Sequence, residues 1–192
     1  MAKKESTFIN MVVALFLVTA IAATSLGYVY ELTKEPIALA IAAKKEAAIK
    51  KVLPEFDEVK SFKVMPVSGK DSIEFNEARL NGEIIGTAIE TYTDDGFSGR
   101  FKIMVGFLPD GTIHNTSLLE HKETPGLGDK MDAKKSKFPN QFMGKNPESF
   151  KLTVSKDGGD VDAITAATIS SRAFCDAVKR AYETYLKEGG NK

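Results

Sequence analysis

The chain has 192 residues, which is enough for one ordinary domain but too few for two large ones. Lysine plus arginine equal aspartate plus glutamate at 26 each, and this zero net charge argues against a general nucleic-acid binder, which carries a basic excess. The single cysteine, Cys175, excludes a disulfide framework and a multi-cysteine zinc or iron–sulfur site within the chain. With only two histidines, His114 and His121, we expect no metal centre, and we interpret Cys175 as a buried apolar residue.

Residues 11–30 are uncharged, and sixteen of these twenty residues are apolar. A helix of that length covers roughly 30 Å, the hydrocarbon thickness of a bilayer, so the stretch predicts a single transmembrane helix. Lys3 and Lys4 precede it, and positive charges at this end favour a cytoplasmic location. We therefore expect residues 1–10 to be cytoplasmic and the part after the helix to be extracytoplasmic. Two alternatives stay open. One is a cleaved signal peptide, since Ala20-Ile21-Ala22 resembles a cleavage site, and the other is a buried core helix.

A second helix is predicted within residues 31–57, just outside the membrane. Residues 31–34 form a short polar connection, Pro36 can be the first residue of a helix, and Pro54 ends it. Between the two prolines the sequence is rich in Ala, Lys and Glu, and apolar residues recur at roughly helical spacing. The apolar positions are Ile37, Ile41, Ala48, Val52 and Leu53. This spacing predicts an amphipathic helix with a solvated, lysine-rich face.

Residues 58–192 predict one α+β domain. Strands are predicted at 61–66, 73–80, 83–92, 100–108, 112–119 and 151–155. Asn81-Gly82 is a strong hairpin signal, and Pro109-Asp110-Gly111 turns the chain between two further strands. One face of the fourth strand carries Phe101, Ile103, Val105 and Phe107. The fold class is therefore an antiparallel, twisted sheet with flanking helices, preceded by one transmembrane helix.

The end of the domain is predicted to be a helix, residues 168–187, which follows a long loop, residues 120–150. Its apolar face consists of Phe174, Ala177, Val178, Ala181, Tyr182 and Tyr185. The loop lacks periodicity and is rich in Gly and Pro, and a loop this long in a compact domain is usually functional or disordered.

Hydroxyl side chains gather just before this last helix, in the segment Asp162-Ala-Ile-Thr165-Ala-Ala-Thr168-Ile-Ser170-Ser171. A simple helix start would explain one or two of them as caps. The other interpretation is a phosphate site, because the first turn of a helix offers free N–H groups and the positive end of the helix dipole. A hydroxyl held there could bind a phosphate or be esterified by one.

The long loop contains Glu123-Thr-Pro-Gly-Leu-Gly-Asp129. This is either a surface turn, with Pro125 and the two glycines at its special backbone positions, or a backbone that closely approaches a flat ligand. In the second case Leu127 is an apolar platform for that ligand.

These segments resemble the signatures of a known family. Asp162-x-x-Thr165-Ala-Ala-Thr168 resembles the Asp-x-x-Ser/Thr-Gly-Ala-Thr signature of FMN-binding domains whose flavin is covalently attached, and the Glu-Thr-Pro-Gly-Leu-Gly loop and Gly96-Phe-Ser-Gly99 resemble two further parts of that pattern. Together with the N-terminal anchor, the chain resembles the family of G subunits of Rnf ion-translocating electron-transport complexes. The C subunit of the sodium-translocating NADH:quinone reductase is a close relative and an alternative, but it is usually longer.

The resemblance implies that a flavin transferase esterifies the phosphate of FMN to Thr168. It also implies that Asp162, Thr165 and Ala167 belong, with Thr168, to the transferase recognition sequence. Ala166 departs from the family, which commonly has Gly there, and a backbone with φ > 0 would be costly for alanine. We expect the other contacts to the cofactor to come from Glu123, Thr124, Gly126, Leu127, Gly128, Lys151, Thr165, Ala166, Ala167 and Ser171.

The implied function is electron relay within a membrane complex that couples electron flow between ferredoxin and NAD to ion export. The protein would not be catalytic alone, and its partners would be the other membrane subunits and the flavin transferase. Two hypotheses of other classes remain, namely an extracytoplasmic flavin-binding sensor and a structural assembly protein without cofactor.

Overall fold

The computed structural model describes residues 7–189, so Lys3 and Lys4 lie outside the described part, and the cytoplasmic N-terminus stays a prediction. The chain divides into two compact units, with the boundary between Lys44 and Lys45. The first unit consists of most of helix α1, Phe8–Val52. By its length and apolar composition α1 could cross a membrane, and its most apolar stretch is not buried inside the protein. The helix therefore suits a single membrane anchor.

Helix α1 is continuous, so the predicted polar connection at residues 31–34 is wrong. Glu, Lys and Leu in this stretch are good helix formers, and Pro36 lies inside the helix, where it removes only one backbone donor. The hydroxyl of Thr33 donates to the carbonyl of Val29 at 2.8 Å, within the same turns. The helix ends at Val52, two residues before Pro54, as predicted, because the residue before a proline is disfavoured in the α conformation.

The second unit is built on one five-stranded antiparallel sheet with the order β1-β2-β3-β4-β5. The strands are β1 Glu58–Val64, β2 Ile73–Leu80, β3 Glu83–Thr93, β4 Phe101–Phe107 and β5 Ile113–Glu120. The predicted hairpin between β2 and β3 is confirmed, with Asn81 at φ 54° and Gly82 at φ 86°. Two consecutive residues with positive φ are typical of the turn that matches the twist of a hairpin.

The predicted strand at residues 151–155 is wrong. Val154 makes only an isolated parallel bridge to Val161, and a short 3-10 helix, η3 Ser155–Asp157, follows. The backbone of Lys151 is satisfied locally, since its N–H donates to a carboxylate oxygen of Asp160 at 2.7 Å and its carbonyl accepts from Asp160 N–H at 3.2 Å. The long loop contains two more 3-10 helices, η1 Gly128–Met131 and η2 Phe138–Phe142.

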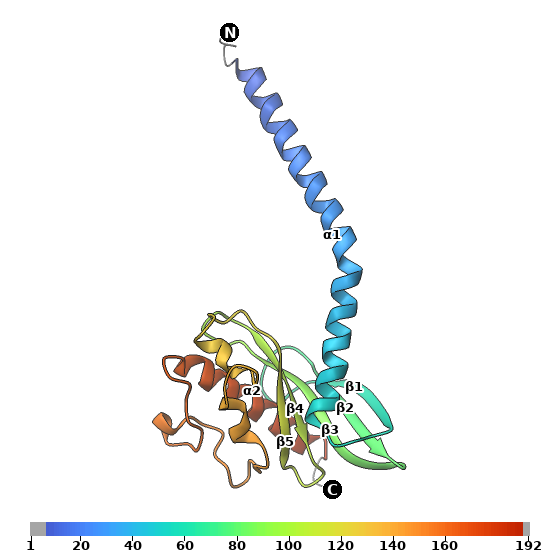
Figure 1. The fold of residues 1–192 in the computed structure, drawn as a ribbon, viewed down its shortest axis with the longest axis vertical. Helices are drawn as coiled ribbons and strands as arrows, with labels where there is room; N and C mark the ends of the chain where they lie inside the picture. The colour runs from blue at the N-terminus through green and yellow to red at the C-terminus, as the bar shows by residue number, and fades with distance from the viewer. Residues whose placement is uncertain (1–6, 190–192) are drawn as a thin grey trace. The chain divides into compact units, whose positions relative to one another are not determined.

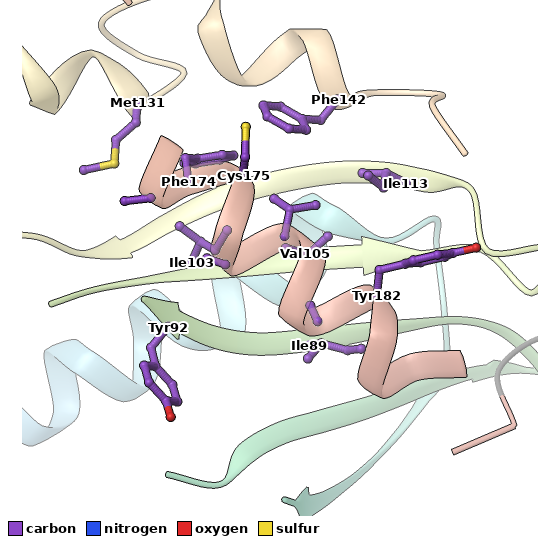
Figure 2. Close-up of a cluster of buried hydrophobic side chains, with 14 of the residues drawn as sticks. Ile89, Tyr92, Ile103, Val105, Ile113, Met131, Phe142, Phe174, Cys175 and Tyr182 are labelled. Atoms are coloured by element: carbon purple, nitrogen blue, oxygen red, sulfur yellow. The ribbon is translucent and has the colours of Figure 1, made fainter. Parts of the chain in front are cut away.

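Helix α2, Thr168–Lys187, covers one face of the sheet and packs on β3 and β4 (Figure 1). Its predicted apolar face is buried, as is the predicted inward face of β4, from Phe101 to Phe107. The core between these two faces extends to η1 and η2, which contribute Met131 and Phe142 (Figure 2). The rings of Phe142 and Phe174 lie 5.1 Å apart, so η2 is fixed against the first half of α2.

The opposite face of the sheet is covered by the end of α1. Its buried residues Ala48, Ile49, Val52 and Leu53 pack on Ala78, Ala88 and Met104 of the sheet. Of the predicted apolar positions of this helix, Ile37 and Ile41 are exposed. Gly106 permits the contact, because a Cβ there would lie 1.9 Å from the carbonyl oxygen of Val52. Strand β4 is thus buried on both faces, with alternate residues facing the two helices.

Candidate functional site

A pocket of about 320 Å³ opens between three segments of the second unit. Its volume is within the range of about 300–1,000 Å³ that is usual for small-molecule sites. The segments are the turn after β3, the loop after β5 and the start of α2. The lining residues are Phe97, Glu123, Thr124, Leu127, Gly128, Ala166, Ala167, Thr168, Ile169 and Ser170.

The start of α2 forms the polar wall of the pocket. Thr168 is the first residue of the helix, and Ala167 before it supplies no side-chain cap. In the part of the chain that the structure describes, the N–H groups of Thr168, Ile169 and Ser170 have no protein acceptor. Three free donors at the positive end of a helix dipole suit an anion such as a phosphate.

A strained turn leads the chain into this helix. Ala166 has φ 61°, the left-handed conformation that favours glycine, and it stands at the position where the resemblance predicted a glycine. The turn is closed by the N–H of Ala167, which donates to the carbonyl of Ile164 at 3.0 Å. The hydroxyl of Ser171 supports it from inside, accepting from Ile164 N–H at 2.9 Å and donating to Ala167 O at 3.0 Å. The geometry that presents Thr168 is therefore held by buried hydrogen bonds.

The loop after β5 forms the opposite wall through a tight turn. Pro125 occupies the second position of the turn, Gly126 the third with φ 79°, and the N–H of Leu127 donates to the carbonyl of Thr124 at 3.2 Å. Proline followed by a residue of positive φ is the pattern of a type II turn. The turn leaves the side chain of Leu127 40% exposed at the pocket.

Glu123 joins all three segments of the pocket. Its carboxylate accepts from Ser98 N–H at 3.1 Å and from the hydroxyl of Ser170 at 2.7 Å, and its own N–H donates to Nδ1 of His121 at 3.2 Å. Gly128 gives it room, since a Cβ there would lie 2.4 Å from Oε2 of Glu123. Glu123 is 4% exposed, so the link is shielded from bulk water.

Apolar side chains surround the mouth of the pocket. Phe97 is 67% exposed, and Ile169 and Leu127 are also exposed. Such a rim beside a set of free N–H donors suits an amphipathic ligand with a flat apolar part and an anionic end. The arrangement can bind and orient such a ligand, and the hydroxyl of Thr168 lies where a covalent bond to it could form.

Six of the residues proposed from the sequence line this pocket, namely Glu123, Thr124, Leu127, Gly128, Ala166 and Ala167, together with Thr168. Gly126 shapes the turn, and Ser171 lies beneath the helix start. Thr165, Asp162 and Lys151 are exposed and are not among the lining residues. The backbone of Asp162 is held by the side-chain amide of Gln141 through two hydrogen bonds of 2.8 and 3.0 Å.

Three lining residues, Phe97, Ile169 and Ser170, were not proposed as ligand contacts from the sequence. Phe97 lies within Gly96-Phe-Ser-Gly99, which resembles part of the family pattern, and Ser170 lies in the hydroxyl-rich segment two residues after Thr168, so the position of each residue was a usable signal. Ile169 had no separate signal. An apolar residue at the second position of a helix is what any amphipathic helix could contain.

Cys175 and His114, which could be reactive elsewhere, are packed or hydrogen-bonded within the fold and do not line the pocket. Cys175 is buried, as predicted, and burial raises the pKa of its thiol to about 12. His114 donates from Nδ1 to the carbonyl of Val52 at 3.0 Å. Within residues 7–189, no cluster of three or more His, Cys, Asp or Glu residues could hold a metal ion.

Comparison with known proteins assigns the chain to a family. The model of the FMN-binding domain matches residues 96–183, which include every lining residue of the pocket. The chain is 39% identical over 194 residues to the G subunit of the ion-translocating oxidoreductase complex of Aliivibrio fischeri, an alignment that covers 93% of this chain and 91% of the relative. The corresponding protein of Vibrio atlanticus is 46% identical over 55% of this chain and 52% of its own length, and that of Salmonella typhi is 42% identical over 60% and 58%. Because the first alignment spans nearly the whole of both proteins, the chain belongs to the family of G subunits of ion-translocating (Rnf) oxidoreductase complexes and contains an FMN-binding domain.

Proposed function

We propose that this protein holds FMN covalently, through an ester between the flavin phosphate and the hydroxyl of Thr168, and relays electrons within the complex. The observation that carries the proposal is the position of Thr168. It is the first residue of α2, it lines the pocket, and three successive N–H groups beside it lack protein acceptors in the described part of the chain. The donors fit a phosphate, and the apolar rim fits the flavin ring.

Different parts of the pocket would hold the two ends of the cofactor. The first turn of α2 would neutralise the phosphodiester through its dipole and its N–H groups. The loop with Thr124, Leu127 and Gly128 would contact the ring, and the exposed side chains of Phe97 and Ile169 would shield it from water. Lys151 remains a proposed contact, although it lies outside the described pocket, and Thr165 and Asp162 are proposed for recognition by the transferase.

The bound FMN supplies the redox chemistry, and the protein sets its position and its electrostatic surroundings. The N-terminal part of α1 would anchor the protein in the inner membrane with the flavin domain on the extracytoplasmic side. There a cofactor lost by dissociation is hard to replace, and a covalent bond removes that loss. The proposed partners are the other membrane subunits of the complex, with electrons passing between ferredoxin and NAD through the assembly.

Covalent attachment is tested by looking for flavin fluorescence in the denatured protein after gel electrophoresis. The full chain is expressed together with a flavin transferase, denatured, separated by electrophoresis and examined for flavin fluorescence. We expect a fluorescent band for the wild type and for Thr168→Ser, which keeps the hydroxyl, and a dark band for Thr168→Ala. Thr153→Ala is the matched control, because Thr153 is exposed and lies outside the pocket.

A dark wild-type band would contradict covalent FMN and favour a structural role without cofactor. A fluorescent Thr168→Ala band would move the attachment to another residue. The orientation is tested separately with a reporter that is active only in the cytoplasm, fused after Lys192. We expect this reporter to be inactive.

A further inference from the structure

We propose that Glu123 is a positioning residue whose buried negative charge lowers the reduction potential of the flavin, and that Ser170 tunes this charge. This inference rests on the proposed function, because it concerns the pocket that would hold the ring. It assigns a role to a carboxylate that binds neither the phosphate nor a metal.

Both carboxylate oxygens of Glu123 form hydrogen bonds with neutral groups of the protein. Oε1 accepts from a backbone N–H of Ser98, and Oε2 accepts from the hydroxyl of Ser170. Hydrogen bonds donated to both oxygens favour the charged form of a carboxylate, which can only accept. Among the described residues, no Lys, Arg or His side chain forms an ion pair with it. The charge is therefore solvated by neutral donors only.

The start of α2 compensates for this buried charge. Ser170 is the third residue of the helix, so its hydrogen bond holds the carboxylate beside the positive end of the helix dipole. Gly96 and Gly128 keep the site compact, because a Cβ at either residue would approach a Glu123 oxygen to 2.7 or 2.4 Å. These contacts fix the carboxylate in the pocket wall rather than leaving it free to turn to solvent.

A fixed negative charge acts on whatever gains electrons in the same pocket. In a site shielded from water it repels added negative charge more strongly than in bulk solvent. Glu123 lines the pocket together with Thr168 and the ring-binding loop, which is the segment with Thr124, Leu127 and Gly128 that would contact the flavin ring. Reduction of the flavin is therefore disfavoured relative to the same pocket with a neutral residue, and the reduction potential is lower.

The link from Glu123 to Ser170 is also a tie between two walls of the pocket. It joins residues 47 positions apart in the sequence and connects the ring-binding loop to the helix turn that contains Thr168. A merely structural tie would require the two hydrogen bonds but not the charge. The variant Glu123→Gln separates the two roles, because its amide can accept from Ser98 N–H and donate to the Ser170 hydroxyl while carrying no charge.

The experiment measures the midpoint potential of the flavin by spectroelectrochemical titration of the full-length, flavin-loaded protein in detergent. Because a covalent flavin cannot dissociate, variants are compared at equal loading, which is checked by fluorescence of the denatured band. We expect a fluorescent band and a more positive potential for Glu123→Gln. Glu90→Gln is the charge-matched control, since Glu90 pairs with Lys45 outside this pocket, and its potential should equal that of the wild type.

Ser170→Ala is the second variant and covers the case in which Glu123→Gln does not fold. It keeps the carboxylate but removes the donor that partly neutralises it, so we expect a more negative potential. A loaded Glu123→Gln protein with an unchanged potential, or a Ser170→Ala protein with an unchanged or more positive one, would overturn the electrostatic role. A dark wild-type band would instead remove the proposed function and this inference together.

Discussion

Two helix ends lie on opposite faces of the same sheet, and they differ in whether their terminal backbone groups have hydrogen-bond partners in the protein. At the end of α1, the carbonyls of Lys51 and Val52 accept hydrogen bonds from Asn115 at 3.2 Å and His114 at 3.0 Å. At the start of α2, the N–H groups of Thr168, Ile169 and Ser170 have no acceptor among the described residues. One end is closed by the neighbouring strand, and the other is left open beside a pocket.

The difference distinguishes a helix end that stabilises the fold from a helix end that is available to a ligand. Unpaired backbone groups are costly when buried, so a helix end packed on a core is normally satisfied by the protein. The end of α1 follows this rule. The start of α2 departs from it and also has a strained residue, Ala166, directly before it. Two local costs at one place are typical of a functional site, where the ligand supplies the missing interactions.

The largest expected effect is at the closed end. Gly106→Ala would place a Cβ 1.9 Å from the carbonyl oxygen of Val52, so either β4 or the end of α1 must move. We expect a loss of about 3 kcal/mol in the free energy of unfolding, the cost of overpacking a tight contact. Thermal unfolding of the full chain in detergent, followed by circular dichroism, measures it.

The control for this variant is Gly27→Ala, since a Cβ at Gly27 meets no atom within 4 Å. If Gly106→Ala unfolds at the same temperature as the control, the docking of α1 on the sheet is not the tight contact described above. Flavin attachment to the folded fraction should be unaffected, because the pocket lies with α2.

The elements with a clear period were predictable from the sequence. The alternation in β4 and the hairpin at Asn81-Gly82 led to the correct strands, and the helical spacing from Phe174 to Tyr185 led to the buried face of α2. These patterns are local, and each residue's neighbours in sequence are enough to reveal them. The predicted break in α1 failed for a related reason, since a proline and a few charges do not stop a helix whose other residues favour it.

The pocket was predictable only in part. Its two main segments were found through their sequence motifs, but the hydrogen bond that joins them connects Glu123 to Ser170, and no local pattern indicates that pairing. Phe97 enters the pocket from a turn after β3, which the register of the sheet brings close to the other segments. The short strand predicted near Val154 failed because Asp160 satisfies the backbone of Lys151.

A smaller effect is expected at the open end. Ala166→Gly removes the cost of holding alanine at φ 61°, so we expect a gain of about 1 kcal/mol in the free energy of unfolding. For a chain of this length that corresponds to a rise of roughly 2–4 °C in Tm. Asn81→Gly is the matched control, because Asn81 has φ 54° but asparagine tolerates this conformation better. Equal gains in the two variants would show that the turn before Thr168 stores no special strain.

The smallest effects concern charge, and they differ between the two regions in their dependence on pH. A hydrogen bond from Lys135 at 2.7 Å holds the pKa of Asp129, in the loop beside the pocket, below its ordinary value. At the end of α1, burial disfavours the charge of Lys45, but the hydrogen bonds to Glu74 and Glu90 outweigh it and raise its pKa. The charge of Asp129, whose pKa is lowered, therefore stabilises the fold above about pH 4. The charge of Lys45, whose pKa is raised, stabilises it up to about pH 10.

These signs predict that the stabilisation by Asp129 is lost in acid and that the stabilisation by the charge of Lys45 is lost in alkali. The stability advantage of the wild type over Asp129→Asn should shrink as the pH falls below about 4 and through the lowered pKa of the folded protein. Its advantage over Lys45→Met should be constant from neutral pH to about 10 and shrink as the pH rises further. Unfolding curves of the three proteins across this range measure both differences. A Lys45→Met difference that is constant up to strong alkali would mean that the ion pairs do not hold the end of α1 on the sheet, and that its apolar contacts and the hydrogen bonds from His114 and Asn115 suffice.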